Sequence, residues 1–417
     1  MPSFRHILSY IFTFSVIAVA FLLPAFPRTT GFFIALLVIC WIADGGFPYK
    51  LRTLLNNPLA LLFMSVYLAW IVWLIPTTNL KAGTDNLALK VSLLLFPLLF
   101  FAPGKLKLPP VRRVLQFFIL GCMLCSLILL SIAAFTYFSE GTNHFTYTHL
   151  TAPLTLHPAF ISLYLVFCIL TLLLPFLERK KDHLFDKAAY SIFLLIFFIL
   201  MIFLLSARQE MIALLMLFPA SLLYYFYRRK RMMTGIAITA AIIVSLVMVL
   251  LLVPEARMRL EKMQSQMEEP YSNEAPNSIT MRKVIWESAG EIISAHPWGV
   301  GSGDVNDALK EKYVAKNLLR PLNENLNAHN QYLQTTIATG IPGLILFIVA
   351  MLSALWAAVL KPDYGYLLFL ILFLFCIITE SMLESEAGVI FFSFFNSLLA
   401  VEALSGKRSA TGSPSVS

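Results

Sequence analysis

Long runs of apolar residues constrain this chain more than any other feature. A helix that crosses the hydrocarbon core of a bilayer needs about 20 mostly apolar residues. Such runs recur along the chain at residues 7–25, 31–43, 58–76, 87–103, 113–137, 158–177, 189–206, 210–227, 233–253, 332–358, 365–380 and 387–404. They predict an all-α polytopic membrane protein with about 12 transmembrane helices.

The composition excludes a water-soluble protein. Hydrophobic residues make up 59% of the chain and charged residues 13%, whereas soluble domains carry about 25% charged residues. The net charge of +8 does not indicate nucleic-acid binding, because the basic residues stand in short clusters between apolar runs. The 5 cysteines lie inside apolar runs and show no disulfide or zinc spacing. We therefore expect the lipid bilayer as a partner, no nucleic acid, no metal and no cofactor.

The distribution of Lys and Arg predicts the orientation of the spans. Cytoplasmic loops of membrane proteins are enriched in these residues. If the N-terminus is inside, the inner loops and tails hold 18 Lys and Arg residues and the short outer loops hold 4. We expect the chain to divide into transmembrane helices 1–9 (1–253), a long outer loop domain (254–331), transmembrane helices 10–12 (332–404) and a disordered cytoplasmic tail (405–417).

The outer loop domain has helical signals of its own. In residues 279–295, apolar and small residues recur at helical spacing, which predicts a helix. Arg282 and Trp286 are four residues apart and share another face of that helix. The run ends at HPWGVGSGD, whose Pro and Gly residues mark a turn.

Two arginines on the outer side suit a phosphate-bearing substrate. Arg208 stands in SARQE, a tight outer turn between two spans, and Arg282 lies on the loop helix. A guanidinium binds phosphate with two parallel hydrogen bonds, so the pair suits a diphosphate. Each residue has a simpler interpretation: Arg208 as a side chain that reaches the lipid headgroups, and Arg282 as a surface residue stacked on Trp286.

His329 stands where the long loop re-enters the membrane, at the start of a predicted helix. A helix N-terminus disfavours the imidazolium cation, so a neutral His there can act as a general base. The simpler interpretation is a helix cap. Further along the same span, Gly340, Pro342 and Gly343 interrupt the helix pattern. Such breaks are tolerated where neighbouring groups satisfy the freed backbone, or they are packing kinks.

Other polar groups on the outer side have weaker signals. The run GVGSGD (299–304) lacks the Lys-Ser/Thr of a phosphate-binding loop, so we do not expect it to bind nucleotide. The outer histidines show no metal-ligand spacing. Glu380, Glu384 and Glu386 lie near the outer end of the eleventh span, where they could partner Arg208 or Arg282 or simply keep a loop solvated.

The run HNQYLQTTIATGIPG resembles the signature of the bacterial O-antigen ligase/polymerase family, which are membrane glycosyltransferases. That signature is a His, then Asn, Ser or Gln, nine residues, then Gly, two residues and a small or polar residue, and His329, Asn330, Gly340 and Gly343 fill its fixed positions. The turn with Arg208 and the block from Arg282 to HPWGVGSG resemble other family landmarks over residues 150–345. One departure is Gln209, because many members have a small residue after the Arg.

The resemblance implies glycosyl transfer on the periplasmic face of the bacterial inner membrane. The donor would be a glycan linked to undecaprenyl diphosphate, and the acceptor lipid A-core or a glycan. The reaction would be inverting and independent of metal. We expect His329, Arg282 and Arg208 to be catalytic. We expect substrate binding by Trp286, Asn330, Gln331, His157 and Glu380.

Several other functions stay open at this point. O-antigen ligase is the first choice, with O-antigen polymerase and protein O-oligosaccharyltransferase as alternatives within the same family. A secondary transporter also fits the number of spans, although internal repeats and charges at mid-membrane, which are typical of transporters, are not found. A structural membrane partner of an envelope assembly is the remaining class.

Overall fold

The computed structural model describes residues 4–177, 184–185, 188–252, 269–274, 277–361 and 363–405. Helices make up 79% of the structure, and its described residues contain no strand. The all-α prediction is therefore confirmed. The tail predicted at 405–417 lies outside the described residues except for Ser405, as do residues 254–268 and 275–276 of the predicted outer loop.

In the described part of the chain, seven helices are long and apolar enough to cross a membrane, and two bent helix pairs raise the number to nine. The seven are α1 (Phe4–Leu22), the nearly continuous pair α5 (Leu80–Lys90) and α6 (Ser92–Phe101), α7 (Val111–Glu140), α10 (Ala188–Leu205), α11 (Arg208–Arg228), α17 (Gln331–Leu360) and α19 (Glu386–Ser405). The bent pairs are α2 (Pro27–Ala43) with α3 (Phe47–Leu55), at 111°, and α8 (Tyr147–Thr151) and η1 (Ala152–Leu154) with α9 (Pro158–Leu177), at 92°.

The count of about 12 spans is not confirmed, because some apolar runs form shorter helices. The short ones are α4 (Pro58–Val72), the part of α12 (Met232–Leu252) up to Ala241, and α18 (Tyr364–Cys376). The run 58–76 illustrates the cause: its helix ends at Val72, and the last residues form a turn. A run of apolar letters does not reveal where a helix stops.

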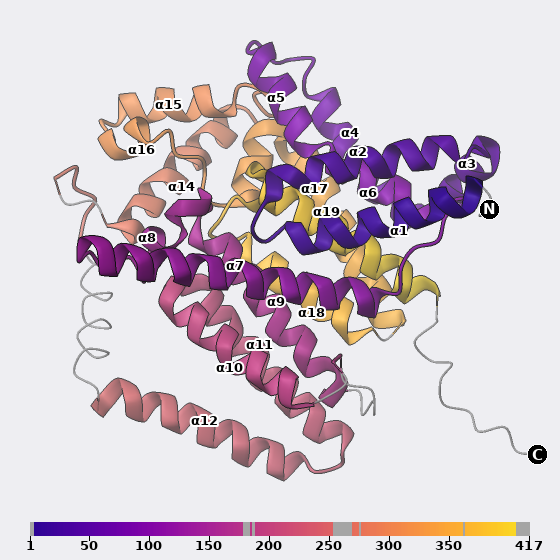
Figure 1. Cartoon of the computed structure of the whole chain (residues 1–417). Helices are drawn as coiled ribbons and strands as arrows, with labels where there is room; N and C mark the ends of the chain where they lie inside the picture. The colour runs from indigo at the N-terminus through magenta and orange to yellow at the C-terminus, as the bar shows by residue number, and fades with distance from the viewer. Residues whose placement is uncertain are drawn as a thin grey trace, which may run out of the picture.

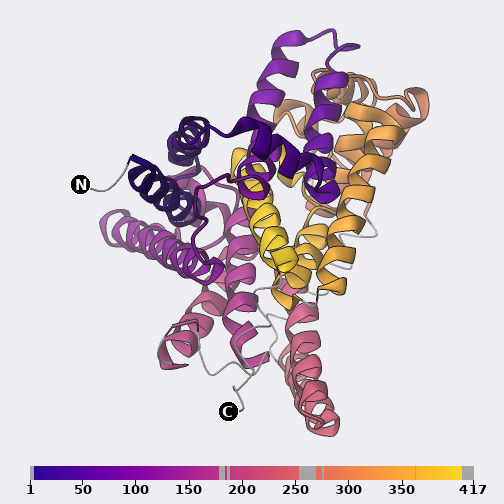
Figure 2. The same ribbon diagram turned by 90° about the vertical axis from the view of Figure 1, so that its right-hand side faces the viewer.

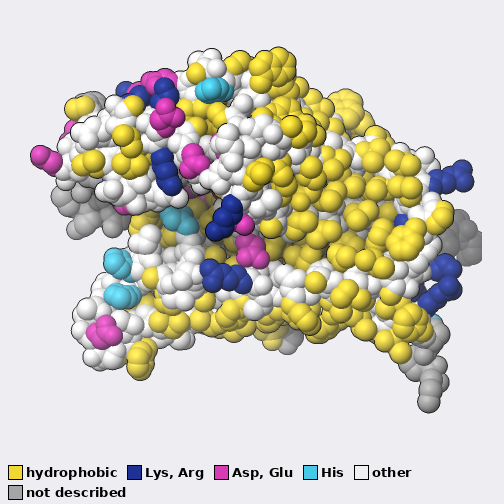
Figure 3. All heavy atoms as spheres, turned by 90° about the horizontal axis from the view of Figure 1, so that it is seen from above, with side chains coloured by type: hydrophobic (Ala, Val, Ile, Leu, Met, Phe, Trp, Pro, Cys, Tyr) yellow, Lys and Arg dark blue, Asp and Glu magenta, His cyan; other side chains and the backbone are white. Residues whose placement is uncertain are grey.

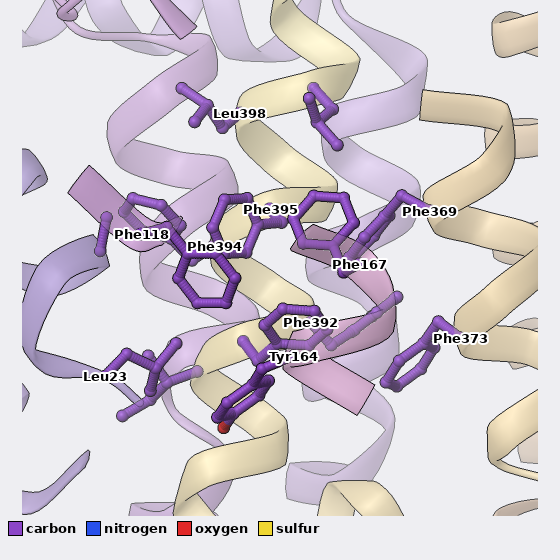
Figure 4. Packing of buried hydrophobic residues seen from close by; sticks show 14 of the residues in the cluster. Leu23, Phe118, Tyr164, Phe167, Phe369, Phe373, Phe392, Phe394, Phe395 and Leu398 are labelled. Carbon is purple, nitrogen blue, oxygen red and sulfur yellow. The ribbon is translucent and has the colours of Figure 1, made fainter. Parts of the chain in front are cut away.

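α19 forms the centre of the bundle, and 83% of its apolar span is buried. Aromatic rings from α7, α9 and α18 surround it (Figure 4). The ring centroids of Phe118 and Phe395 lie 4.7 Å apart, and those of Phe373 and Phe392 lie 4.3 Å apart. Such close aromatic pairs stabilise a bundle interior beyond the area that they bury. α12, in contrast, lies at the edge of the bundle and packs against α11 (Figure 1).

Three helices of the segment predicted to be the outer loop gather at one end of the bundle. α14 (Ser278–Ala295), α15 (Val305–Ala315) and α16 (Leu319–Asn323) lie at the end of the bundle opposite the start of α1 (Figure 1), and Figure 2 shows the bundle turned by 90°, with α19 in yellow inside it. A second hydrophobic core, which includes Ile285, Leu309, Tyr313 and Ile337, joins them to α17. Figure 3 shows acidic, basic and His side chains gathered at this end around a recess, with a broad hydrophobic surface beside it.

α17 is broken at Gly340, where the backbone leaves the helical region (φ 66°, ψ −176°). In a regular helix the carbonyl of Ala338 would bond the N–H of residue 342, but Pro342 has none. The turn after α14 supplies the missing donors: Val300 N donates to Ile337 O at 2.8 Å, and Gly301 N donates to Ala338 O at 3.1 Å. The freed backbone is thus satisfied by a neighbour, as the sequence allowed.

Glycine is required where these two segments touch. A Cβ on Gly299 would lie 2.5 Å from the backbone N of Gly340, and a Cβ on Gly340 would lie 2.4 Å from the carbonyl carbon of Trp298. The turn 299–304 also packs on the segment after α4, where Asp304 accepts hydrogen bonds from Thr78 N and Asn79 N, both 2.8 Å. The Gly-rich run 299–304, which follows α14, therefore joins that helix to α17 and to the segment after α4.

Candidate active site

Arg282 projects from α14, the predicted loop helix. Asn277 caps this helix, since its side chain accepts hydrogen bonds from Ile279 N and Thr280 N at 3.1 and 2.9 Å. Met281 and Ile285 face the second core, which leaves Arg282 half-buried on the adjoining face. Its Nη2 forms an ion pair with Glu380, whereas its buried Nε has no hydrogen-bond partner within the described structure.

His329 lies immediately before α17 and is not its cap. The cap is Asn330, whose side chain accepts a hydrogen bond from Leu333 N at 3.0 Å. His329 itself has a left-handed backbone with φ 43°. For a residue other than Gly this conformation costs about 1–2 kcal/mol, so the surroundings must hold it in place.

The surroundings of His329 hold it through hydrogen bonds on both sides. Its own N–H donates to Asn327 Oδ1 at 2.9 Å, and Ala328 N donates to Gln334 Oε1 at 3.0 Å. On the other side, Asn330 N donates to Ser381 Oγ at 3.1 Å. The strained backbone thus fixes the direction of the imidazole ring.

Glu380 joins His329 to Arg282. One carboxylate oxygen, Oε2, lies 3.2 Å from His329 Nδ1, and the other, Oε1, pairs with the guanidinium of Arg282. The side chain of Glu380 is 14% exposed and that of His329 is 19% exposed. Burial alone would raise the pKa of Glu380, but the hydrogen bond and charge of His329 and the charge of Arg282 hold it below its ordinary value. Glu380 therefore acts as a carboxylate between two potential cations.

The loop that carries Glu380 is itself held in place. Gln209, in the first turn of α11, donates from Nε2 to the carbonyls of Phe375 and Cys376 at 2.8 and 2.6 Å. Its Oε1 accepts a hydrogen bond from Thr379 Oγ1. The residue that departs from the family pattern thus connects the Arg208 turn to the loop of Glu380.

Arg208 begins α11, and its side chain is exposed. Within the described part of the chain its guanidinium has no hydrogen bond or ion pair. Its neighbour Gln209 bonds to the end of α18, so Arg208 stands near the loop of Glu380 while remaining available to a ligand. Arg208 and Arg282 differ in this respect, because Arg282 already has one protein partner.

The other predicted site residues have different surroundings. Gln331 is fully buried, and its amide bonds Leu383 N, Thr335 Oγ1 and Glu384 Oε1. Trp286 packs partly against the second core, with its buried Nε1 lacking a partner in the described structure. His157 is exposed and caps α9 through its Nδ1, which accepts from Ala159 N at 3.3 Å. A substrate-binding role for these residues, and for Asn330, stays a prediction.

His157 also belongs to the electrostatic surroundings of the site, because the charges of Glu380, His329 and Arg282 all act on it. The sequence did not single out a further member, Glu210. Its carboxylate is buried, one oxygen has no partner within the described structure, and it interacts electrostatically with Glu380 and Arg282. The one sequence signal for Glu210 is its position two residues after Arg208, in a charged turn that looks like an ordinary polar connection between two spans.

Residues 193–348 match the family model described as O-antigen ligase. This stretch is similar to O-antigen ligase domains. The resemblance drawn from the sequence is confirmed, and the domain contains Arg208, Arg282 and His329. Among curated proteins, none matches this chain. The domain's family is one of membrane glycosyltransferase-like enzymes, which indicates an O-antigen ligase or polymerase type of function and glycan-lipid substrates in general.

Proposed function

We propose that this protein is an O-antigen ligase that moves a glycan from undecaprenyl diphosphate to lipid A-core at the periplasmic face of the inner membrane. The observation that carries the proposal is the Arg282–Glu380–His329 bridge. It presents a phosphate-binding guanidinium and an imidazole side by side, with Arg282 Nε and His329 Nε2 unused by the described protein.

Each part of the reaction has a candidate residue. Arg208 and Arg282 bind the diphosphate and stabilise the negative charge that grows on it as it leaves, which needs fixed cations and no metal. His329 Nε2 takes the proton from the acceptor hydroxyl. The acceptor oxygen bonds to the anomeric carbon while the bond from that carbon to the diphosphate oxygen breaks, and the diphosphate keeps the electron pair. Attack opposite the leaving group inverts the anomeric centre.

The test is an assay with purified protein in lipid nanodiscs, undecaprenyl diphosphate-linked glycan and lipid A-core. We expect lipid A-core to gain the glycan. Arg208→Ala and Arg282→Ala should each slow transfer at least about tenfold, because a hydrogen bond to a charged group contributes about 1.5–3 kcal/mol.

The products distinguish the alternatives. Growth of the glycan on undecaprenyl diphosphate would identify a polymerase, and glycan on the Ser or Thr of an added acceptor protein would identify an O-oligosaccharyltransferase. Absence of transfer to any acceptor from a folded protein would overturn the proposal. A Lys316→Ala variant is a matched control, since Lys316 is a cation of the outer segment that pairs with Glu291.

A further inference from the structure

The bond between His329 and Glu380 defines the tautomer of the imidazole. A carboxylate only accepts hydrogen bonds, so the 3.2 Å contact requires a proton on Nδ1 of His329. In the neutral ring the lone pair is then at Nε2, the atom that has no partner within the described structure. With the other tautomer, Nδ1 would face the carboxylate lone pair to lone pair.

The residues before and after Glu380 in the chain fix its position. Before it, Thr379 donates to Gln209, and after it, Ser381 Oγ accepts from Asn330 N at 3.1 Å. Its second oxygen is held by Arg282. A carboxylate whose chain neighbours are fixed in this way holds its two partners, His329 and Arg282, in a constant relation.

We infer that Glu380 is the positioning residue of the transfer reaction, which fixes the Nδ1–H tautomer of His329 and stabilises the imidazolium that forms when Nε2 takes the acceptor proton. The inference rests on the proposed function. Glu380 stays ionised throughout and takes no proton. Through its other oxygen it also orients the guanidinium of Arg282.

A second carboxylate in the same loop provides a matched control. Glu384 pairs with Lys90 at 2.8 Å and bonds Gln331, so it also links a cation to α17 but does not touch His329. Glu380→Gln and Glu384→Gln make the same chemical change four residues apart. Both variants are to be purified and their melting temperatures measured, because Glu384→Gln leaves the buried Lys90 without its counter-ion and the folded fraction must be known.

We expect Glu380→Gln to lower kcat about 10²–10⁴-fold, the range for loss of the group that fixes a catalytic His, while KM for the lipid-linked donor changes little. Glu384→Gln should keep kcat within about threefold of the original protein once corrected for folded fraction, because surrounding contacts away from the reacting atoms mainly affect stability. Equal kcat values for the two variants would overturn the inference.

The pH profile adds a readout that a purely structural role would not change. Loss of the negative charge makes protonation of His329 harder, so the acid limb of kcat/KM should move to lower pH in Glu380→Gln. The other charged groups near this pair, Arg282, His157 and Glu210, are unchanged in both variants. Glu380→Asp keeps the charge and should return the acid limb toward its original position.

An unchanged acid limb in Glu380→Gln would also overturn the inference. The proposed function fails differently, since the unmodified protein would then transfer no glycan to any acceptor. If the unmodified protein transfers glycan but the Glu380 variants have the same kcat as Glu384→Gln, the proposed function stands and the positioning role of Glu380 does not.

Discussion

Glu380 and Glu384 lie in one loop, and each connects a cation to the first residues of α17, but only one of the two networks is complete. Glu384 binds Lys90 and Gln331, and Lys90 also lies 4.2 Å from the ring centre of Trp70. The side chains of Lys90 and Glu384 are 1% and 11% exposed. Every polar atom of this network has a protein partner, which is the arrangement of a structural clamp.

The Glu380 network, in contrast, leaves atoms unused. Arg282 Nε and His329 Nε2 are buried without a partner in the described structure, and Arg282 is 31% exposed. A buried polar atom without a partner costs about 1–3 kcal/mol, and a ligand that hydrogen-bonds these two atoms would remove that cost. The comparison teaches that two networks of similar composition can differ in whether the protein itself satisfies their polar atoms, and the network of the proposed site is the one that leaves atoms for a ligand.

The largest expected effect is on the rate of transfer, and it concerns His329 in the Glu380 network. His329→Gln should slow transfer by about 10²–10⁴-fold, since Gln cannot accept the proton at neutral pH. The melting temperature should stay close to that of the original protein, because Glu380 and Arg282 still pair. Turnover is measured with purified donor and acceptor. If the folded His329→Gln variant kept near-original turnover, His329 would not be the general base.

Removal of the cation from the structural network should affect stability. Lys90→Met leaves Glu384 buried without its counter-ion, which costs about 3–5 kcal/mol. Thermal unfolding in detergent measures the loss. The double variant Lys90→Met with Glu384→Gln should recover most of it. If the single and the double variant have the same melting temperature, the ion pair between Lys90 and Glu384 does not stabilise the fold.

A smaller effect is expected at the residue between the two networks. Asn330→Ala removes the cap of α17, which costs about 0.5–2 kcal/mol of stability. Asn330→Asp should restore it, because Asp also caps helices well. Transfer per folded molecule should fall far less than in His329→Gln. A comparable fall would show that Asn330 contacts the substrate.

The smallest expected effect concerns the stability of the fold at acidic pH. The pKa of Glu380 is lowered from the ordinary value of 4.5, so the ionised group contributes stability above that pH and loses it as the pH falls through the lowered pKa. The melting temperature of Glu380→Gln should therefore depend less on pH below 4.5 than that of Glu384→Gln. Identical curves for the two variants would show that Glu380 gains nothing from its partners.

The sequence predicted the helices better than their ends. The expected spans 113–137 and 332–358 correspond to α7 and α17, and the loop helix expected at 279–295 is α14. Apolar periodicity determines that these segments are helical and which face is buried. It does not determine where helices stop or bend, as at the 111° bend between α2 and α3, and so the count of about 12 spans is not confirmed.

The site was predictable to the level of single residues and not of their contacts. Arg282 and His329 were singled out by their chemistry, and Glu380 was a candidate partner of either arginine. That Glu380 contacts both residues depends on the loop after α18, whose position is set by Gln209 and Ser381. Contacts between segments 50 or more residues apart follow from tertiary packing, which periodicity and motifs do not encode.

The break at Gly340 has a mechanical consequence. The turn after α14 is bonded to both sides of the break: Val300 N and Gly301 N donate to the carbonyls of Ile337 and Ala338, and Ile341 N donates to the carbonyl of Pro297 at 2.9 Å. The break is therefore clamped, and the turn after α14 ties that helix to α17 at this point. Arg282 on α14 and His329 at the start of α17 are thus linked through the backbone as well as through Glu380, so the spacing of the two groups does not depend on one side chain alone.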